Sequence, residues 1–157
     1  MKSQTITPCL WFDNQAEEAA NFYISIFKNS RIGQISRYGK EGFEIHRKQA
    51  GTVMVISFQL DGQEFTALNG GPQFKFTEAI SLQITCDTQD EIDHYWTKLS
   101  EGGEEGPCGW LKDKYGVSWQ VVPSILPKLL SDPGKSERVT KVFLQMKKFD
   151  IKSLLTA

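Results

Sequence analysis

The first half of the chain has a pattern of hydrophobic and polar residues that predicts a strand, a helix and three further strands. Residues 5–12 alternate with period two, which is typical of a strand with one buried face. The next apolar residues instead follow the i, i+3, i+4, i+7 spacing of an amphipathic helix. That helical stripe consists of Ala19, Phe22, Tyr23 and Ile26. The later strands are expected at residues 31–38, 51–60 and 63–69, with a loop at 39–49 and a hairpin turn at Asp61-Gly62.

The same order of patterns restarts at residue 79. Residues 79–86 alternate again, and the next apolar stripe repeats the helical spacing with Ile92, Tyr95, Trp96 and Leu99. Matching positions, at an offset of 74 and then of 54, are Asp13 and Asp87, Gln15 and Gln89, Glu17 and Glu91, and Gly62 and Gly116. Because the whole order of elements recurs, we predict an internal duplication.

Three predicted helices begin at residues that can cap them. Asn14 is followed three residues later by Glu17, and Thr88 by Glu91, which is the spacing of a capping box. Asp150 is expected to cap a last helical turn that runs through Leu155.

Beyond Pro123 the pattern changes to helices alone. Residues 124–130 predict a short helix, Asp132-Pro133-Gly134 ends it, and a longer helix follows from Ser136. The apolar stripe of the longer helix consists of Val139, Val142, Phe143 and Met146. Such a stripe must be buried, so we expect the tail to pack on the sheet or on a second subunit.

Each half of the duplication has too few strands to enclose a core by itself. Two such sheets placed side by side would form a curved, barrel-like surface with the helices outside. In each strand, the large apolar residues should face the helix and the polar or amphipathic residues should face the concave cavity. The expected cavity residues are Thr7, Cys9, Trp11, Glu64, Thr66, Ser81, Gln83, Ser118 and Gln120.

The stretch from residue 102 to residue 123 predicts a hairpin with unusual side chains. Its turn contains Gly116, and Cys108, Trp110, Lys112 and Asp113 lie close together before it. This density of amphipathic and reactive side chains indicates the wall of a small-molecule pocket, whose ligand-binding residues would include Trp110. A second tryptophan of the stretch, Trp119, is expected to belong to the core.

Composition narrows the possible classes of function. The 157 residues carry a net charge of −1 and no long apolar run, so we expect neither a nucleic-acid partner nor a signal peptide or membrane span. Cys9, Cys86 and Cys108 are widely spaced and form no CxxC pair. This spacing indicates reduced thiols in a cytoplasmic protein rather than a disulfide scaffold or a structural zinc site.

Four strings of sequence carry a resemblance to a known superfamily: CLWFDNQAEEAANFY, ALNGGPQFKFTEAISLQI, CGWLKDKYGVSWQVVP and LLSDPGKSERVTKVFLQMKKFDI. Together with the duplication, they resemble the PhnB-like branch of the vicinal oxygen chelate superfamily, which often carries a demethylubiquinone methyltransferase label. The superfamily contains glyoxalase I, fosfomycin- and bleomycin-resistance proteins and extradiol dioxygenases.

The resemblance implies an α+β fold of paired βαβββ modules, the glyoxalase/bleomycin-resistance fold. The paired modules would occupy residues 1–123, with repeats at about 1–77 and 78–123, and residues 124–157 would form a short C-terminal helical extension. The resemblance also implies a homodimer.

Enzymes of this superfamily usually bind a divalent ion through His and Glu on the strands that line the cavity. Here residues 5–12 and 79–86 contain no His, Asp or Glu, and Gln120 stands at the position that resembles the family's terminal Glu. His46 falls in a predicted loop and His94 in a predicted helix. We therefore expect no metal. We also expect no other cofactor, because the sequence lacks the glycine-rich strand-to-helix turn of nucleotide-type methyl donors.

Two functions remain open on the sequence. The first is a metal-independent binding protein for a small, flat, partly apolar molecule, which stacks on tryptophan and is oriented by Thr66, Gln83 and Gln120. The alternative is an enzyme of transferase, lyase or isomerase type that acts on a small aromatic or vicinal-oxygen substrate. In that case Cys108 would be the nucleophile, or Lys112 and Asp113 the acid/base pair.

Overall fold

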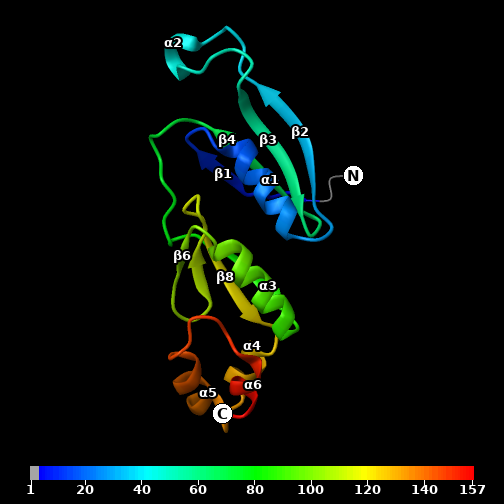
Figure 1. The fold of residues 1–157 in the computed structure, drawn as a ribbon, viewed down its shortest axis with the longest axis vertical. Helices are drawn as coiled ribbons and strands as arrows, with labels where there is room; N and C mark the ends of the chain where they lie inside the picture. Colours follow the sequence, from blue (N-terminus) through cyan, green and yellow to red (C-terminus); the bar gives the residue numbers. More distant parts are fainter. Residues whose placement is uncertain (1–3) are drawn as a thin grey trace. The chain divides into compact units, whose positions relative to one another are not determined.

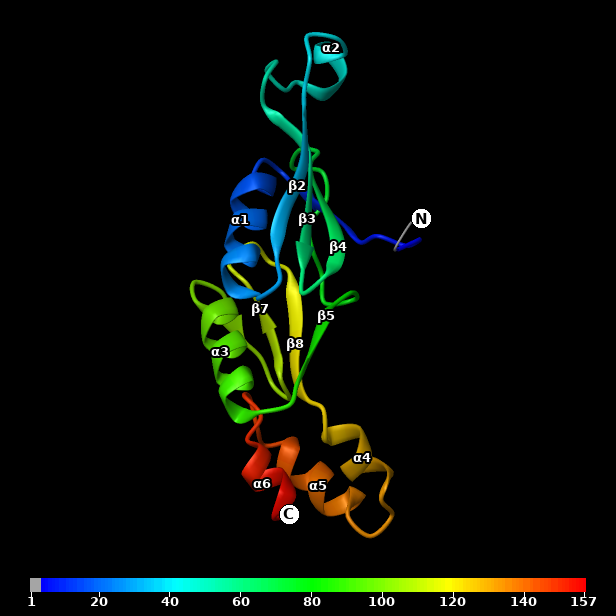
Figure 2. The ribbon, with the colours of Figure 1, turned by 90° about the vertical axis from the view of Figure 1, so that its right-hand side faces the viewer.

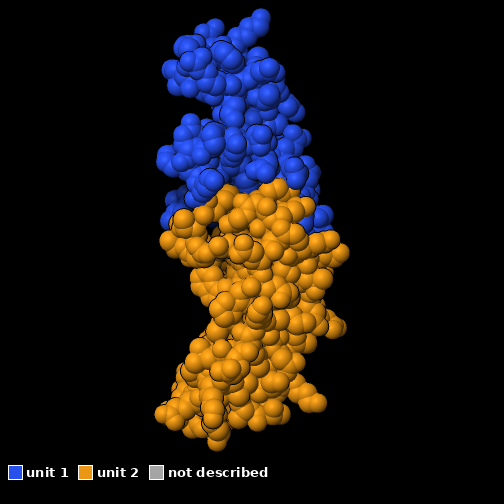
Figure 3. Space-filling view, turned by 60° about the vertical axis from the view of Figure 1, so that its left-hand side comes forward, with its two compact units in different colours: residues 1–75 blue, residues 76–157 orange. Residues whose placement is uncertain are grey.

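The structure, a computed structural model, describes residues 4–157, and the chain divides into two compact units. Unit 1 covers residues 1–75 and unit 2 covers residues 76–157 (Figure 3). Each unit has a four-stranded sheet with a long helix against one face (Figures 1 and 2). No helix in the described part of the chain is long and apolar enough to span a membrane.

Unit 1 places its first and last strands side by side. Its elements are β1 (Cys9–Phe12), α1 (Ala16–Ile26), β2 (Arg31–Arg37), α2 (Phe43–His46), β3 (Val53–Leu60) and β4 (Gln63–Asn69). The sheet order is β1-β4-β3-β2, with β1 parallel to β4 and the other pairs antiparallel. The apolar stripe of α1 supplies the core, where the rings of Tyr23 and Phe58 stack at 6.2 Å between centroids.

Unit 2 repeats this connectivity and adds a helical extension. Its elements are β5 (Leu82–Cys86), α3 (Gln89–Ser100), β6 (Glu104–Glu105), β7 (Trp110–Lys112), β8 (Ser118–Pro123), α4 (Leu126–Ser131), α5 (Ser136–Phe143) and α6 (Ile151–Leu155). The sheet order β5-β8-β7-β6, with β5 parallel to β8, matches that of unit 1. The predicted duplication and the paired βαβββ fold are therefore confirmed.

Several local predictions are also confirmed. Asp61 and Gly62 both have positive φ angles, 48° and 80°, as a tight two-residue hairpin turn requires. Thr88 and Glu91 form a complete capping box on α3, and the Asp150 side chain accepts a hydrogen bond from Ser153 N at the start of α6. Trp119 is only 2% exposed and belongs to the core.

Other local predictions are wrong. The strand expected at 5–12 begins only at Cys9, and the strand expected at 79–86 begins only at Leu82, because the partner strands provide no regular ladder before those points. The expected loop at 39–49 contains α2, so His46 lies at the end of a short helix.

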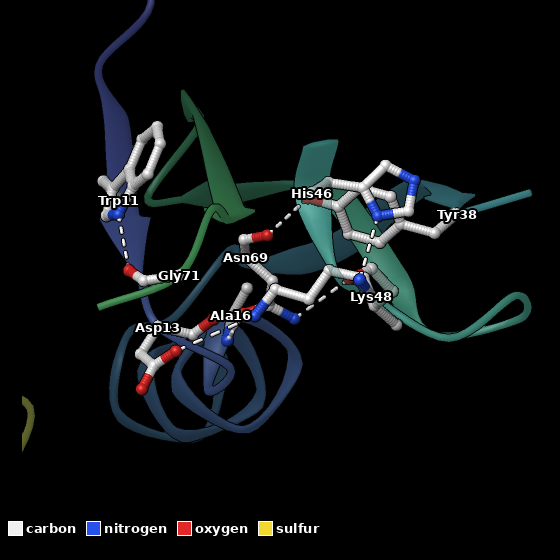
Figure 4. Close-up of polar contacts among 9 residues, drawn as sticks. Trp11, Asp13, Ala16, Tyr38, His46, Lys48, Asn69 and Gly71 are labelled. Atoms are coloured by element: carbon white, nitrogen blue, oxygen red, sulfur yellow. Dashed lines mark hydrogen bonds and ion pairs between the residues drawn. The ribbon is translucent and has the colours of Figure 1, made fainter. Parts of the chain in front are cut away.

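The predicted capping box at Asn14 and Glu17 is also absent. Gln15 is the N-cap of α1 and makes no side-chain cap hydrogen bond. The backbone N–H of Ala16 instead donates to Oδ1 of the buried Asn69, 2.8 Å away at the end of β4 (Figure 4).

The C-terminal extension packs within unit 2. Its chain is joined to the loop before β7 by two backbone hydrogen bonds, from Cys108 N to Met146 O and from Gly109 N to Lys147 O, each 2.8 Å. Gly109 has a φ of +81°, and a Cβ there would collide with the ring of the buried Phe149. The stripe of α5 is buried here at Val139, which has no exposed surface.

Candidate functional site

A cavity of about 420 Å³ lies on unit 2 beside the β6–β7 hairpin. The pleat determines its wall, because residues two apart on a strand share one face of the sheet. Trp110 and Lys112 of β7 therefore share a face, and across the β7–β8 ladder they pair with Gln120 and Ser118. The lining residues are Glu78, Glu104, Glu105, Gly106, Pro107, Trp110, Leu111, Lys112 and Ser118.

Ser118 is the most informative residue of the lining. It is only 2% exposed, and its Oγ has no hydrogen-bond partner among the residues that the structure describes. A buried hydroxyl without a partner costs about 1–3 kcal/mol, so such groups are uncommon in folded proteins. The free hydroxyl therefore indicates a place where a bound molecule can donate or accept a hydrogen bond.

The neighbouring polar residues of β5 and β8 form a second, paired group. Gln120 donates from Nε2 to Ser81 Oγ at 2.8 Å, and Gln83 is its partner across the parallel ladder. The structure therefore brings together four of the predicted ligand-binding residues on one sheet, Gln83, Trp110, Ser118 and Gln120, and a fifth, Ser81, lies immediately before β5 and bonds to Gln120. Of these, Trp110 and Ser118 line the cavity itself.

Lys112 is held as a cation. Its Nζ forms an ion pair with the carboxylate of Glu78, and Glu104 lies opposite it across the β6–β7 ladder. The hydrogen bond and charge of Glu78, with the charge of Glu104, raise the pKa of Lys112 above its ordinary value. The same hydrogen bond lowers the pKa of Glu78. A lysine with a raised pKa stays protonated at neutral pH, so it cannot serve as a base there.

Asp113 follows the last residue of β7, and its carboxylate is bonded to the turn and to Trp119. Its side chain is 2% exposed, and the carboxylate accepts hydrogen bonds from the backbone N–H groups of Tyr115 and Val117 and from the indole of Trp119. These three donors come from the turn and from β8, so the carboxylate stabilises the hairpin. The structure therefore does not bring Lys112 and Asp113 together as an acid/base pair.

Cys108 also lies apart from the cavity lining. It has a φ of +54°, and its thiol contacts the backbone carbonyl of Phe143 at 3.7 Å, as a sulfur donor would. The residue thus contributes to the junction with the C-terminal extension.

The predicted residues of unit 1 form a separate group on β1 and β4. Cys9 is exposed and pairs with Thr66 across the parallel ladder. Glu64 accepts a hydrogen bond from Gln59, and its backbone N–H donates to Gln4 Oε1 at 3.0 Å.

Trp11 holds the connector after β4. Its Nε1 donates to Gly71 O at 2.9 Å (Figure 4), and its ring meets Phe74 edge-on with 4.9 Å between centroids. A side chain at Gly70 would collide with the indole, so a glycine is needed beneath it.

A second polar cluster in unit 1 was not predicted from the sequence. Figure 4 shows Tyr38 OH donating to Asn69 O at 2.6 Å and Lys48 reaching the Asp13 backbone carbonyl at 2.9 Å. His46 Nδ1 accepts from Lys48 N at 2.9 Å, and its Nε2 lies 3.0 Å from Glu41 O. Both ring nitrogens of His46 are thus used to fold the α2 loop.

The carboxylates beside Lys112 were also missed. The adjacent Glu104 and Glu105 precede Gly106 without any pattern that marks a site, and Glu78 lies 34 residues before Lys112, so nothing local connects the two. Within residues 4–157, no group of three or more His, Cys, Asp or Glu side chains is arranged to hold a metal ion.

Two βαβββ modules with this strand order form the glyoxalase/bleomycin-resistance fold, which solved fosfomycin resistance proteins share. A sequence model of the family described as 3-demethylubiquinone-9 3-methyltransferase matches residues 4–122, and the chain belongs to this PhnB-like family. Residues beyond 122, which include the helical extension, lie outside that match. A comparison with curated protein sequences finds no match.

Solved structures agree with this assignment. A putative 3-demethylubiquinone-9 3-methyltransferase, PhnB protein, from Bacillus cereus is 42% identical, with a TM-score of 0.67, over 77% of this chain and 100% of that one. Protein PA1353 from Pseudomonas aeruginosa is 19% identical, with a TM-score of 0.62, over 77% and 98%.

A fosfomycin resistance protein shows the same fold with a metal. FosX from Listeria monocytogenes, solved with Mn(II) and sulfate, is 16% identical, with a TM-score of 0.55, over 83% of this chain and 97% of that one. At this level of identity the likeness concerns the fold alone.

Proposed function

We propose that the chain is a metal-independent binding protein for a small, flat molecule that occupies the cavity beside Trp110. The observation that carries the proposal is the buried, unpaired hydroxyl of Ser118 in the cavity wall. A ligand that hydrogen-bonds this hydroxyl recovers the cost of its burial, and that recovery adds to the affinity.

The surrounding residues supply contact area and orientation. Trp110 is half-buried and offers an aromatic surface on which a flat ligand can stack. Gln120 is fixed by its hydrogen bond to Ser81, so its carbonyl oxygen has a defined position on the same sheet face. A largely apolar wall with a few fixed polar groups is typical of small-molecule sites.

Metal independence is supported by how the cavity's possible ligands are engaged: Glu78 pairs with Lys112, Glu105 accepts from the Trp96 indole, and no three His, Cys, Asp or Glu side chains of residues 4–157 are grouped to hold an ion. Gln120, where the superfamily resemblance places a Glu, is a neutral amide that donates to a serine. Neutral amides and hydroxyls are weak ligands for the divalent ions that such sites bind.

Binding without catalysis is supported by the state of the three candidate catalytic residues. Lys112 is held protonated by Glu78, the Asp113 carboxylate is buried among three donors, and the Cys108 thiol contacts a backbone carbonyl. None of these groups is available as a base or nucleophile at the cavity wall.

Isothermal titration calorimetry on protein dialysed against a chelator tests the proposal. Flat bicyclic aromatic compounds should bind the wild-type chain, and Trp110→Leu should weaken binding by about tenfold because the stacking surface is lost. Trp11→Leu is the matched control, since that indole lies in unit 1 and contacts the Gly71 connector. Binding that appears only after Mn²⁺ is added, or that both variants keep, would contradict the proposal.

A further inference from the structure

Resting on the proposed function, we propose that the ligand of the Trp110 cavity is a flat aromatic cation, such as a protonated or N-alkylated heteroaromatic ring. The cavity carries more negative than positive charge beside its aromatic wall. Two carboxylates on the cavity side, Glu78 and Glu104, face the single ammonium group of Lys112. The third, Glu105, is held by an indole N–H of Trp96 on α3, 2.9 Å away.

The charge arrangement disfavours an anionic ligand. Glu78 already forms the ion pair with Lys112, and Glu104 is its neighbour across the ladder. An anion that approached the ammonium group would have to compete with Glu78 and would lie close to the carboxylates of the lining. A cation meets an excess of two negative charges, because three carboxylates and one ammonium group line the cavity and the indole hydrogen bond leaves Glu105 charged.

Trp110 also favours a positively charged ligand. A cation over the face of a tryptophan is attracted by the ring quadrupole, and tryptophan is the strongest of the aromatic side chains in this respect. Trp110 lies two residues from Lys112 on the same strand face, so a ring stacked on the indole lies close to the carboxylates.

Ser118 provides the independent sign that a molecule binds here. Ser118 is 2% exposed and lines this cavity, and its buried hydroxyl has no partner among the described residues. It can accept from a ring N–H or donate to a ring substituent. Exposed carboxylates alone do not indicate a binding site. The buried hydroxyl beside them does, because buried polar groups normally have a hydrogen-bond partner.

Three quinoline probes separate charge from shape: 3-amino-1-methylquinolinium is the cation, 3-aminoquinoline is the neutral form and quinoline-4-carboxylate is the anion. The amino group of the first two can donate to Ser118 Oγ, so the comparison between them isolates the positive charge. Calorimetry on the full chain near neutral pH should give the tightest binding for 3-amino-1-methylquinolinium, by about tenfold over 3-aminoquinoline, and this preference should shrink at high salt. Glu104→Gln should weaken binding of the cation by about fivefold and leave binding of 3-aminoquinoline unchanged.

The Lys112→Met variant gives the sharpest contrast. It removes the competing ammonium group and frees Glu78, so the affinity for 3-amino-1-methylquinolinium should rise by about fivefold. Glu101→Gln, an exposed carboxylate at the end of α3 and outside the lining, is the matched control and should change nothing.

Three results would overturn the inference. Equal affinity for the three probes would exclude a charge preference while leaving the proposed function intact. Tightest binding of quinoline-4-carboxylate, lost in Lys112→Met, would reverse the sign of the ligand charge. Binding of none of the probes would overturn both the charge inference and the proposed function.

Discussion

The carboxylate of Asp113 accepts a hydrogen bond from the indole N–H of Trp119 at 2.9 Å, and both side chains are buried. The same carboxylate also holds the backbone N–H groups of Tyr115 and Val117. One acidic side chain thus ties the β7–β8 turn to the core of unit 2, below the face that carries the cavity.

Asp113→Asn is expected to lower the free energy of unfolding by about 2–3 kcal/mol, because the new amide N–H₂ would face the indole N–H with no acceptor between them. Urea unfolding measures this loss. Asp90→Asn, in the exposed first turn of α3, is the control and should change stability by no more than about 0.5 kcal/mol. An equal effect of both substitutions would show that the Asp113 hydrogen bonds are not the stabilising feature.

Asn69 is expected to contribute more than Asn14 to the free energy of unfolding, because it caps the start of α1. It is buried, its Oδ1 accepts from Ala16 N, and its Nδ2 donates to Val53 O at 3.1 Å. Asn69→Ala should cost about 2–3 kcal/mol, because a buried donor and a buried acceptor lose their partners. Asn14→Ala, at the cap position expected from the sequence, should stay within about 0.5 kcal/mol. A larger loss for Asn14→Ala in thermal or urea unfolding would contradict the observed capping.

Ser118→Ala should have opposite effects on stability and on binding. Removing a buried hydroxyl that has no partner within residues 4–157 should leave the unliganded protein as stable or raise its stability by up to about 1 kcal/mol. The affinity for a bicyclic aromatic ligand should fall by about tenfold, because the ligand loses its hydrogen bond.

Ser57→Ala is the control for this experiment. Ser57 Oγ accepts from Gln34 N at 2.7 Å, so its removal should destabilise the protein without changing ligand affinity. Destabilisation by Ser118→Ala with unchanged affinity would show that the hydroxyl serves the fold alone.

The Cys86 thiol is expected to make stability depend on alkaline pH. Burial, followed by the charges of Glu91 and Asp87, raises the pKa of Cys86 from 9.0 to about 12. Since the folded pKa is higher than the unfolded one, the stabilisation is complete below pH 9 and declines as the unfolded chain loses its proton above that pH.

Comparison with Cys86→Ala isolates this contribution. The difference in unfolding free energy between wild type and variant should shrink by about 1.4 kcal/mol per pH unit above that point. In native protein a thiol reagent should label the exposed Cys9 and spare Cys86. A pH-independent difference, or rapid labelling of Cys86, would contradict the burial of this thiol.

The parts of the fold that the sequence predicts are those encoded locally. The period-two and helical patterns locate the strands and the two long helices, and their recurrence predicts the duplication, because each half repeats the same burial pattern. The cap of α1 could not be predicted in this way, since Asn69 lies 53 residues from Ala16 and meets it only after β4 has paired with β1.

Some residues of the candidate site could be predicted from the sequence, but the contacts of Lys112 could not. Alternation along the strand assigned Ser118 to a cavity, and the density of amphipathic side chains around residue 110 assigned Trp110 to a pocket; both residues line the cavity. The partnership of Lys112 with Asp113 was inferred from adjacency in sequence, whereas neighbours on a strand point to opposite faces. Glu78 reaches Lys112 from the connector before β5, which is a tertiary contact without a local pattern.

Ligand binding at Trp110 can be measured most directly by NMR, because the four tryptophan indole N–H groups give separate signals. Chelator-treated protein would be titrated with whichever of the three quinoline probes binds most tightly. The Trp110 indole signal should shift and saturate, while the signals of Trp11, Trp96 and Trp119 stay in place. An unchanged Trp110 signal at saturating probe, or a shift that appears only after Mn²⁺ is added, would contradict metal-independent binding at this cavity.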